Sequence, residues 1–313
     1  MIQILTRRIT HLIPLLMITS LVVFWVTNIL PGDPTTSILG DYGTTQDREA
    51  LRHQLGLDQP LLLRYGEWLL RTISGDLGQS ITTHQSVLSM LLQRIPVTLE
   101  LAVLAVALSI IVGVPMGILA ALWRNSWVDT LLSAISLSGM AIPYFWVGLL
   151  LIMFLSVKLG WLPPSGYTPF FGDPLSNLRL MILPVLTTGI AEVALVMRQM
   201  RASMLQVLSQ DFIRTARAKG AGEIRVVFGH ALRNSIIPVA TIIGLQFGTL
   251  IGGTVVVESI FSLPGLGRMI VEAISERDYP VIQGAFLMVV LGVIIVNLIT
   301  DLSYSLIDRR VKP

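Results

Sequence analysis

The sequence has 313 residues, of which 53% are apolar and only 13% are charged. Soluble domains carry about 25% charged residues, so the composition excludes an ordinary water-soluble globule. The 22 Lys and Arg residues and 19 Asp and Glu residues give a net charge of +3, too small a surplus to indicate nucleic acid as a partner. The absence of cysteine excludes disulfides, zinc–thiolate sites, iron–sulfur clusters and thiol catalysis. The composition favours a protein whose solvent is lipid.

Six apolar segments are each long enough to cross a hydrocarbon core of about 30 Å at about 1.5 Å per helical residue. The predicted transmembrane helices are 9–30, 98–122, 130–157, 180–200, 236–257 and 281–307. The first ends in "LPGDP" without the small-residue cleavage pattern of a signal peptide, so we expect it to be retained. The sequence therefore predicts an all-α, polytopic membrane protein with six spans, in which residues 1–313 form a single transmembrane domain.

The distribution of Lys and Arg predicts the orientation of these spans. The positive-inside rule discounts long segments, and 31–97 is such a segment. Once it is set aside, most of the remaining basic residues fall on the side of the two termini. We therefore expect both termini and the loop 201–235 to be cytoplasmic, and 31–97 to be external (periplasmic).

The outer segment 31–97 shows three short helical patterns. One covers residues 45–55, and a third covers 85–94. Between them, Asp58 is a candidate N-cap for a helix that has Pro60 in its first turn and stops before Gly75. We expect amphipathic helices that lie against the bilayer or the helix bundle, and no separate domain.

The loop 201–235 is long for so compact a protein and is rich in arginine. Its pattern predicts a helix from Ser203 to Lys219 that ends at Gly220, followed by a second helix from Glu223. Positive-inside topology alone could account for the individual arginines. The helix–glycine–helix form needs a further cause.

The segment "DFIRTARAKGAGEIRVVFGHALRNSIIP" (211–238) resembles the cytoplasmic signature of ABC-transporter permeases, in the version found in peptide, glutathione and nickel importers. The resemblance extends along nearly the whole chain. Its other motifs are "LPGDP" at 30–34, "QLGLDQPL" at 54–61, "GDLGQS" at 75–80, "TLEL" at 98–101, "GGTVVVESIFSLPGLGR" at 252–268 and "RDYPVIQG" at 277–284. Arg214-Thr215-Ala216 stands where the general signature has Glu-Ala-Ala, so a glutamate contact to the ATPase is not carried over to Arg214. The chain also has "DRR" at 308–310 where many relatives have Asp-Pro-Arg.

The resemblance implies the type I importer permease fold and one half of a transport channel in a bacterial-type inner (plasma) membrane. It implies four kinds of partner: a second homologous permease, two ATP-binding cassette ATPases, an external substrate-binding protein and the lipid bilayer. The chain has no G-x-x-x-x-G-K-[ST] loop, so we expect it to bind no cofactor and to carry no catalytic residue, with ATP and Mg held by the ATPases. The residues expected to couple it to the ATPases are Asp211, Arg214, Thr215, Ala216, Arg217, Ala218, Lys219 and Gly220.

A few polar residues fall inside the predicted spans. Glu192 lies near the middle of the fourth span, where an ionised carboxylate costs at least about 2.5 kcal/mol unless it is paired or hydrated. It either lines the transport pathway and meets a cationic group of the substrate, or it bonds to a neighbouring helix or the partner subunit. Asn297 and Asp301 share one face of the last span and favour packing or coupling. Glu100 and Asp129 lie near span ends, and the sequence indicates no special role for them.

Glycines recur every four residues in the fifth span, at Gly244, Gly248 and Gly252. Their spacing predicts a helix-packing seam, which faces another helix of this chain, the partner permease or the substrate route. The outer motif 258–268 has the Pro and Gly content of a sharply turned, re-entrant or interfacial loop.

The sequence leaves several functions open. Within the importer interpretation, a dipeptide, oligopeptide or glutathione is the favoured substrate, and nickel or a metal–chelate complex is the alternative; the four scattered histidines predict no metal site in this chain. An ion-coupled secondary transporter would need more ionisable groups within its spans. An intramembrane hydrolase would need H-E-x-x-H or G-x-S-x-G, which are absent, and a structural assembly factor is the third class.

Overall fold

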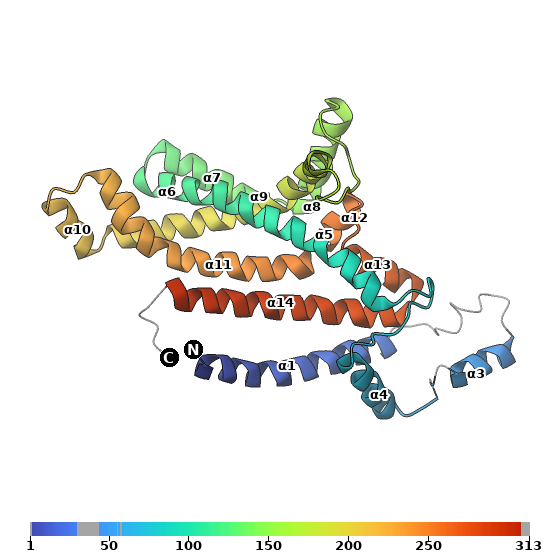
Figure 1. Ribbon diagram of the computed structural model, residues 1–313. Coiled ribbons are helices and arrows are strands. Elements are labelled where there is room, and N and C mark those ends of the chain that lie inside the picture. Colours follow the sequence, from blue (N-terminus) through green and yellow to red (C-terminus); the bar gives the residue numbers. More distant parts are fainter. Residues whose placement is uncertain (1, 30–43, 55, 57, 308–313) are drawn as a thin grey trace. The chain divides into compact units, whose positions relative to one another are not determined.

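The computed structural model describes residues 2–29, 44–54, 56 and 58–307, without the side chains of 2–12, 29, 51, 54 and 301–307 (Figure 1). All the regular elements of this described part are helices, as the sequence predicts. The chain divides into two compact units, which we describe separately. Unit 1 consists of residues 1–97 and 264–294, and unit 2 consists of residues 98–263 and 295–312.

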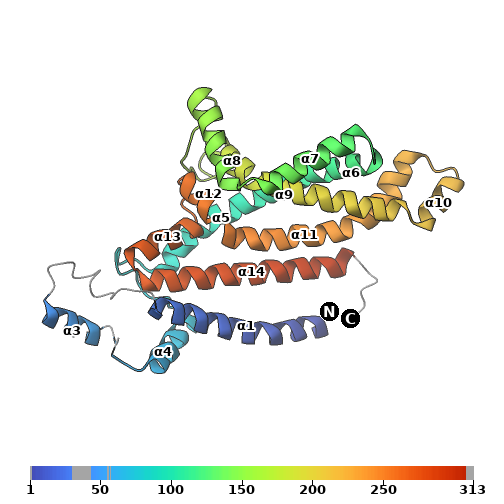
Figure 2. The ribbon, with the colours of Figure 1, turned by 180° about the vertical axis from the view of Figure 1, so that it is seen from behind.

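Unit 2 is organised around one long helix, α9 (Pro174–Leu208). α9 packs against α6, α7, α8, α11, α12, η2 and η4, and Figures 1 and 2 show it running between α6 and α7 on one side and α11 on the other. The neighbouring elements are the end of α5 (Val87–Leu108), the π-helical η2 (Ser109–Gly113), α6 (Val114–Leu122), α7 (Trp127–Ala141), α8 (Tyr144–Leu151), the π-helical η3 (Ile152–Lys158), α10 (Asp211–Ala218), the π-helical η4 (Arg225–Ala231), α11 (Leu232–Gly253) and α12 (Val255–Ile260).

The close approach of α6 to α9 depends on glycine. A Cβ atom built on Gly117 would lie 2.6 Å from the carbonyl oxygen of Met197 and 2.6 Å from the Cβ of Met200. At Gly113 it would lie 2.9 Å from the carbonyl oxygen of Val193. Any larger residue at these two positions would push the helices apart, because the nearest atoms include backbone.

The predicted span 130–157 is not one continuous helix, because α7 and the helix formed by α8 and η3 meet at an angle of 99°. The break lies at Ile142, whose ψ of 128° is extended. Pro143 follows it, and a proline disfavours the helical conformation of the residue before it. The apolar composition on both sides of Pro143 hides this break from the sequence.

Four helices of the described part are long and apolar enough to cross a membrane, or five if the bent pair counts as one span. The four are Val87–Leu122, Pro174–Leu208, Arg225–Gly253 and Tyr279–Thr300. The first predicted span falls on α1 (Ile2–Ile29), of which the apolar part with described side chains is Ile13–Asn28. The predicted six spans and the orientation of the termini stay predictions.

Unit 1 combines α1, α3 (Thr45–Gln54), α4 (Leu61–Ile73), the first part of α5, α13 (Leu266–Glu276) and the first part of α14 (Tyr279–Ile307). Its core joins the start of α5 to α13 and α14 through Val87, Leu91, Leu266, Met269, Ile282 and their neighbours. The predicted separate helix over 85–94 is therefore wrong, since these residues are mostly the first turns of α5. The predicted helix over 45–55 corresponds to α3.

Two polar contacts within unit 1 involve aspartates. Asp278 is 2% exposed and accepts hydrogen bonds from the side-chain hydroxyls of Ser80 (2.5 Å) and Thr82 (3.1 Å). Asp58 does not cap α4 as predicted, because α4 begins after Pro60 without a side-chain cap. Asp58 instead pairs with Nδ1 of His53 at 2.7 Å.

Candidate functional site

The loop with the transporter-like signature contains a short separate helix, α10, which covers eight residues. The predicted continuous helix 203–219 is wrong at one point, since α9 ends at Leu208 and α10 begins at Asp211. The predicted stop at Gly220 is confirmed: its φ is +81°, a left-handed conformation that favours glycine. The amide of Gly220 donates to the carbonyl of Arg217 (2.9 Å), and that of Ala221 donates to Ala216 (3.2 Å), which is the Schellman pattern.

The fully buried side chain of α10 is Ile213, which anchors the helix to the rest of unit 2. Ile213 is 0% exposed and belongs to a core cluster with residues of α6, α9, η4 and α11. Its buried companions include Ile118, Met204 and Val226. An isolated helix of this length is unstable in water, so its packing at Ile213 decides where it lies. Ile213 therefore links α10 to α6, α9, η4 and α11.

The predicted coupling residues surround this anchor. Ala216 is partly buried against the core cluster, and the others are exposed. They are Asp211, Arg214, Thr215, Arg217, Ala218, Lys219 and Gly220. Arg214 and Asp211 form an exposed ion pair with 3.6 Å between Nη1 and Oδ1. The exposed face of α10 thus carries charged groups.

Arg217 has a partner within the loop. Its Nε and Nη2 donate to Oε1 and Oε2 of Glu223 at 2.7 and 3.1 Å. These hydrogen bonds lower the pKa of the Glu223 carboxyl and raise the pKa of the Arg217 guanidinium. The pair bridges the turn at Gly220 and ties α10 to the helix that begins at Glu223.

Large apolar side chains are exposed along the same loop. Phe212 is 43% exposed, Ile224 is 79% exposed and Phe228 is 57% exposed. Exposed aromatic and aliphatic residues beside charged ones are typical of a protein–protein contact. The loop therefore carries both apolar and charged groups that a partner could cover.

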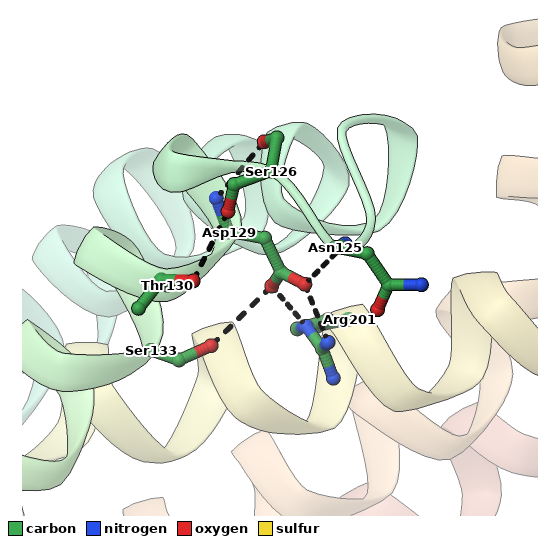
Figure 3. A network of polar contacts seen from close by, with 6 residues as sticks. All are labelled: Asn125, Ser126, Asp129, Thr130, Ser133 and Arg201. Atoms are coloured by element: carbon green, nitrogen blue, oxygen red, sulfur yellow. Dashed lines mark hydrogen bonds and ion pairs between the residues drawn. The ribbon is translucent and has the colours of Figure 1, made fainter.

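An ion pair joins α7 to α9 near the same end of unit 2. Nε and Nη2 of Arg201 donate to Oδ1 and Oδ2 of Asp129 at 2.6 and 2.8 Å, as Figure 3 shows. The amide of Asn125 also donates to Asp129 at 3.0 Å, and the hydroxyl of Ser133 donates at 3.4 Å. The sequence indicates no special role for Asp129, but its side chain is only 7% exposed and anchors the start of α7.

Glu192 lies within α9, as predicted, and is partly buried. Its Oε2 is buried and has no hydrogen-bond partner among the described residues. The polar group next to this carboxyl is the side chain of Gln246 in α11, which no sequence pattern singles out. Gln246 is 5% exposed, and both of its amide atoms also lack a partner in the described part of the chain.

The three glycines of α11 have different surroundings. A Cβ on Gly244 would overlap the side chain of Thr300 in α14. Gly248 is buried, and Gly252 is exposed. The Asp301 side chain next to Thr300 lies outside the described residues, and Asn297 is partly buried. The predicted role of these three glycines as a helix-packing seam stays a prediction.

Glu258 lies in the predicted turned loop 258–268, and the sequence did not predict that its carboxylate is buried. It is 0% exposed, and its Oε1 accepts hydrogen bonds from the hydroxyls of Thr98 (2.7 Å) and Thr254 (2.9 Å). The loop around it contains α12 and a left-handed Ser262 with φ of +54°. These bonds fix the end of α11 to the beginning of the unit 2 part of α5.

Unit 1 contains a cavity of 570 Å³ that is lined by charged and aromatic side chains. Arg52, Arg64 and Trp68 line it, together with Tyr279 at the start of α14. Burial, and secondarily the charge of Arg52, lower the pKa of the Arg64 guanidinium. Three arginines, Arg52, Arg64 and Arg71, line this cavity and favour an anionic or polar group there, although Glu67 and Asp76 also line it.

Comparisons with known proteins agree with this architecture. Residues 113–313 match the family described as "Binding-protein-dependent transport system inner membrane component", and residues 1–102 match the N-terminal family of the same transport system membrane components. The chain is 42% identical over 306 residues to a peptide transport system permease protein of Brucella abortus (strain 2308), which covers 98% of both chains.

It is also 44% identical to the glutathione transport system permease protein of Escherichia coli O6:H1, which covers 98% of this chain and 97% of that one. Among solved structures, the inward-facing MetNI methionine ABC transporter aligns with a TM-score of 0.58 and 17% identity, covering 70% of this chain and 96% of that one. That likeness shows the fold alone. The matches along nearly the whole sequence establish that this chain belongs to the family of binding-protein-dependent transport system inner membrane components.

Proposed function

We propose that the chain is the membrane-spanning permease subunit of an ATP-driven importer for small peptides. The substrate is a dipeptide, an oligopeptide or glutathione, delivered by an external binding protein. The observation that carries this proposal is the similarity, over 98% of the chain, to permeases named for peptide and for glutathione transport. Nickel or a metal–chelate complex is the alternative cargo for the same machinery, and no observation on this chain favours it.

The proposed importer works by alternating access. A second homologous permease completes the channel, and two separate ATPase subunits bind and hydrolyse ATP with Mg. We place the complex in a bacterial-type inner membrane, with six spans, both termini and α10 on the cytoplasmic side, and residues 31–97 outside. An ion-coupled secondary transporter is not favoured, because the family of this chain is that of binding-protein-dependent systems.

We further propose that α10 is the coupling helix of this subunit. Two observations support the proposal: its exposed face is charged and flanked by apolar Phe212 and Ile224, and its inner face is anchored at Ile213 in the core shared by α9 and α11. An ATPase that moves on ATP binding would carry α10 with it, and the two membrane helices would follow. The element then has the two-state behaviour that alternating access needs.

The test is ATP-dependent uptake of labelled di- and tripeptides, glutathione and nickel chelates into vesicles that contain the whole complex and its binding protein. Peptide or glutathione uptake is expected. Accumulation of the nickel chelate alone would move the assignment to metal import, and no ATP-dependent uptake of any of these would refute the importer.

Gly220→Val and Gly222→Val form a matched pair for the coupling helix. A Cβ at either position meets no described atom within 4 Å, but only Gly220 has a positive φ. We expect Gly220→Val to abolish most uptake while the ATPases still associate, and Gly222→Val to retain it. Gly220→Pro is expected to act like Gly220→Val. Near-normal uptake in the Gly220 variants, with normal ATPase association, would refute the coupling role.

A further inference from the structure

Two polar side chains lie next to one another in the apolar part of unit 2. Glu192 belongs to α9 and Gln246 to α11, and these helices pack against each other. Both helices are long and apolar enough to cross a membrane. Oε2 of Glu192, and Oε1 and Nε2 of Gln246, are buried without a hydrogen-bond partner in the described residues.

The pair cannot satisfy itself. If the Gln246 amide N–H turns to donate to Glu192, the Gln246 carbonyl oxygen still has no donor, because a carboxylate only accepts. Buried polar groups are nearly always hydrogen-bonded in native proteins, and an unmet group is especially costly where lipid replaces water. Gln246 is 5% exposed, so bulk water does not reach it freely in this conformation.

The unmet groups define the chemistry of the missing partner. They are a carboxylate oxygen, an amide carbonyl and an amide N–H, on two adjacent helices. An alkylammonium group supplies donors for the two oxygens, and a neighbouring carbonyl accepts from the amide. The amino-terminal end of a peptide carries these groups next to one another, a protonated amine followed by the first peptide carbonyl. Lipid chains carry none of them.

We propose that Glu192 and Gln246 form a transient contact site for the protonated amino terminus and first peptide group of a translocating peptide. This inference rests on the proposed peptide import. One carboxylate and one amide make a small site, as a transport pathway needs, since a passing substrate must be held weakly enough to leave. The bent α7–α8 pair and α10 are not part of it.

The direct test measures binding of a labelled dipeptide and of its N-acetylated form to the assembled permease–ATPase complex in detergent, without the binding protein. Glu192→Gln keeps the size of the side chain and removes its charge. We expect it to weaken binding of the free-amine dipeptide by about tenfold, as charge-assisted hydrogen bonds are about twice as strong as neutral ones. Binding of the acetylated dipeptide is expected to be weak and unchanged by the variant.

Glu100→Gln is the matched control, because Glu100 lies in another apolar helix, α5, and accepts a hydrogen bond from Tyr167 at 2.8 Å. It should leave the preference for the free amine unchanged. Gln246→Leu removes the unmet amide, so it should weaken binding of both dipeptides without lowering the thermal stability of the complex. Equal loss of both dipeptides in Glu192→Gln, or no loss, would overturn the proposal.

Two further measurements distinguish a substrate contact from a subunit contact and from a failure of peptide import. If Glu192→Gln or Gln246→Leu releases the second permease during purification, the pair is a subunit contact and the proposal is overturned. If the wild-type complex transports no peptide in vesicles, the proposed function itself fails. Normal peptide uptake by Glu192→Gln, with an unchanged preference for the free amine, would overturn this inference and leave peptide import intact.

Discussion

Replacing Ile213 with alanine should release α10 from the body of unit 2. Ile213 is 0% exposed, and removing a buried isoleucine side chain to the β-carbon costs about 2–5 kcal/mol. α10 has eight residues, fewer than the 12–15 or so that an isolated helix needs, so its position depends on this packing, together with the partly buried Ala216 and the pair of Arg217 with Glu223. A loss of about 2 kcal/mol would raise the population of the undocked helix about 30-fold.

Limited trypsin digestion of the purified permease measures this population. Arg214, Arg217 and Lys219 lie in or directly after α10 and are exposed, and cleavage of a folded segment tracks its opening when opening is fast. We expect the first-order cleavage rate at these sites to rise about 30-fold or more in Ile213→Ala. Ile224→Ala is the control, since Ile224 is 79% exposed and its loss should leave the rate unchanged. Equal cleavage rates in the two variants would refute the anchor.

Three other predictions concern the same unit. Gly117→Ala should lower stability by about 1–3 kcal/mol and the melting temperature in detergent with it, whereas Gly139→Ala, whose Cβ would meet Ala194 at an ordinary 3.4 Å, should not. Asp129→Ala should lower the free energy of unfolding by about 3 kcal/mol, because it leaves the Arg201 guanidinium without its carboxylate partner. The double variant Asp129→Ala/Arg201→Ala should lose less stability than the sum of the two single losses, and strictly additive losses would contradict the ion pair. Hydrogen bonds from Arg217 lower the pKa of the Glu223 carboxyl, so the contribution of this pair is present above the ordinary carboxylate pKa and is lost as the pH falls through the lowered value. Hydrogen exchange in the turn at Gly220, corrected for intrinsic rate, should therefore speed up only as the pH falls below the ordinary carboxylate pKa.

Local signals in the sequence predict where the helices lie along the chain, but they do not predict where a helix breaks or the angle at which two helices meet. The glycine that ends α10 and the apolar runs of α9, α11 and α14 are properties of neighbouring residues, so they are readable from a single chain. The break before Pro143 has a local cause, but the angle of 99° between the two helices does not follow from any local signal, since both halves are apolar. Ser209 and Gln210 lie between α9 and α10, but neither residue is a strong helix breaker, so the sequence pattern does not indicate that the two helices are separate.

The polar contacts of the candidate sites are partly predictable. Glu192 is conspicuous because it is a charge in an apolar run, whereas Gln246 is neutral and passes as one polar residue among many. Asp129 and Arg201 are 72 residues apart, and no local sequence pattern predicts that they form a pair. The family resemblance predicts that Arg217 contacts an ATPase. Its hydrogen bond to Glu223 shows that this surface arginine also links two helices of its own loop.

The bonds from Ser80 and Thr82 to Asp278 have a consequence for biosynthesis. They join segments separated by 198 and 196 residues, and unit 1 is built from the first 97 residues and a stretch that begins at Pro264. Because domains fold as their residues emerge from the ribosome, unit 2 can assemble most of its core first. Ser80 and Thr82 cannot make these two bonds until Asp278 has been made, so a truncation before Asp278 would leave unit 1 incomplete.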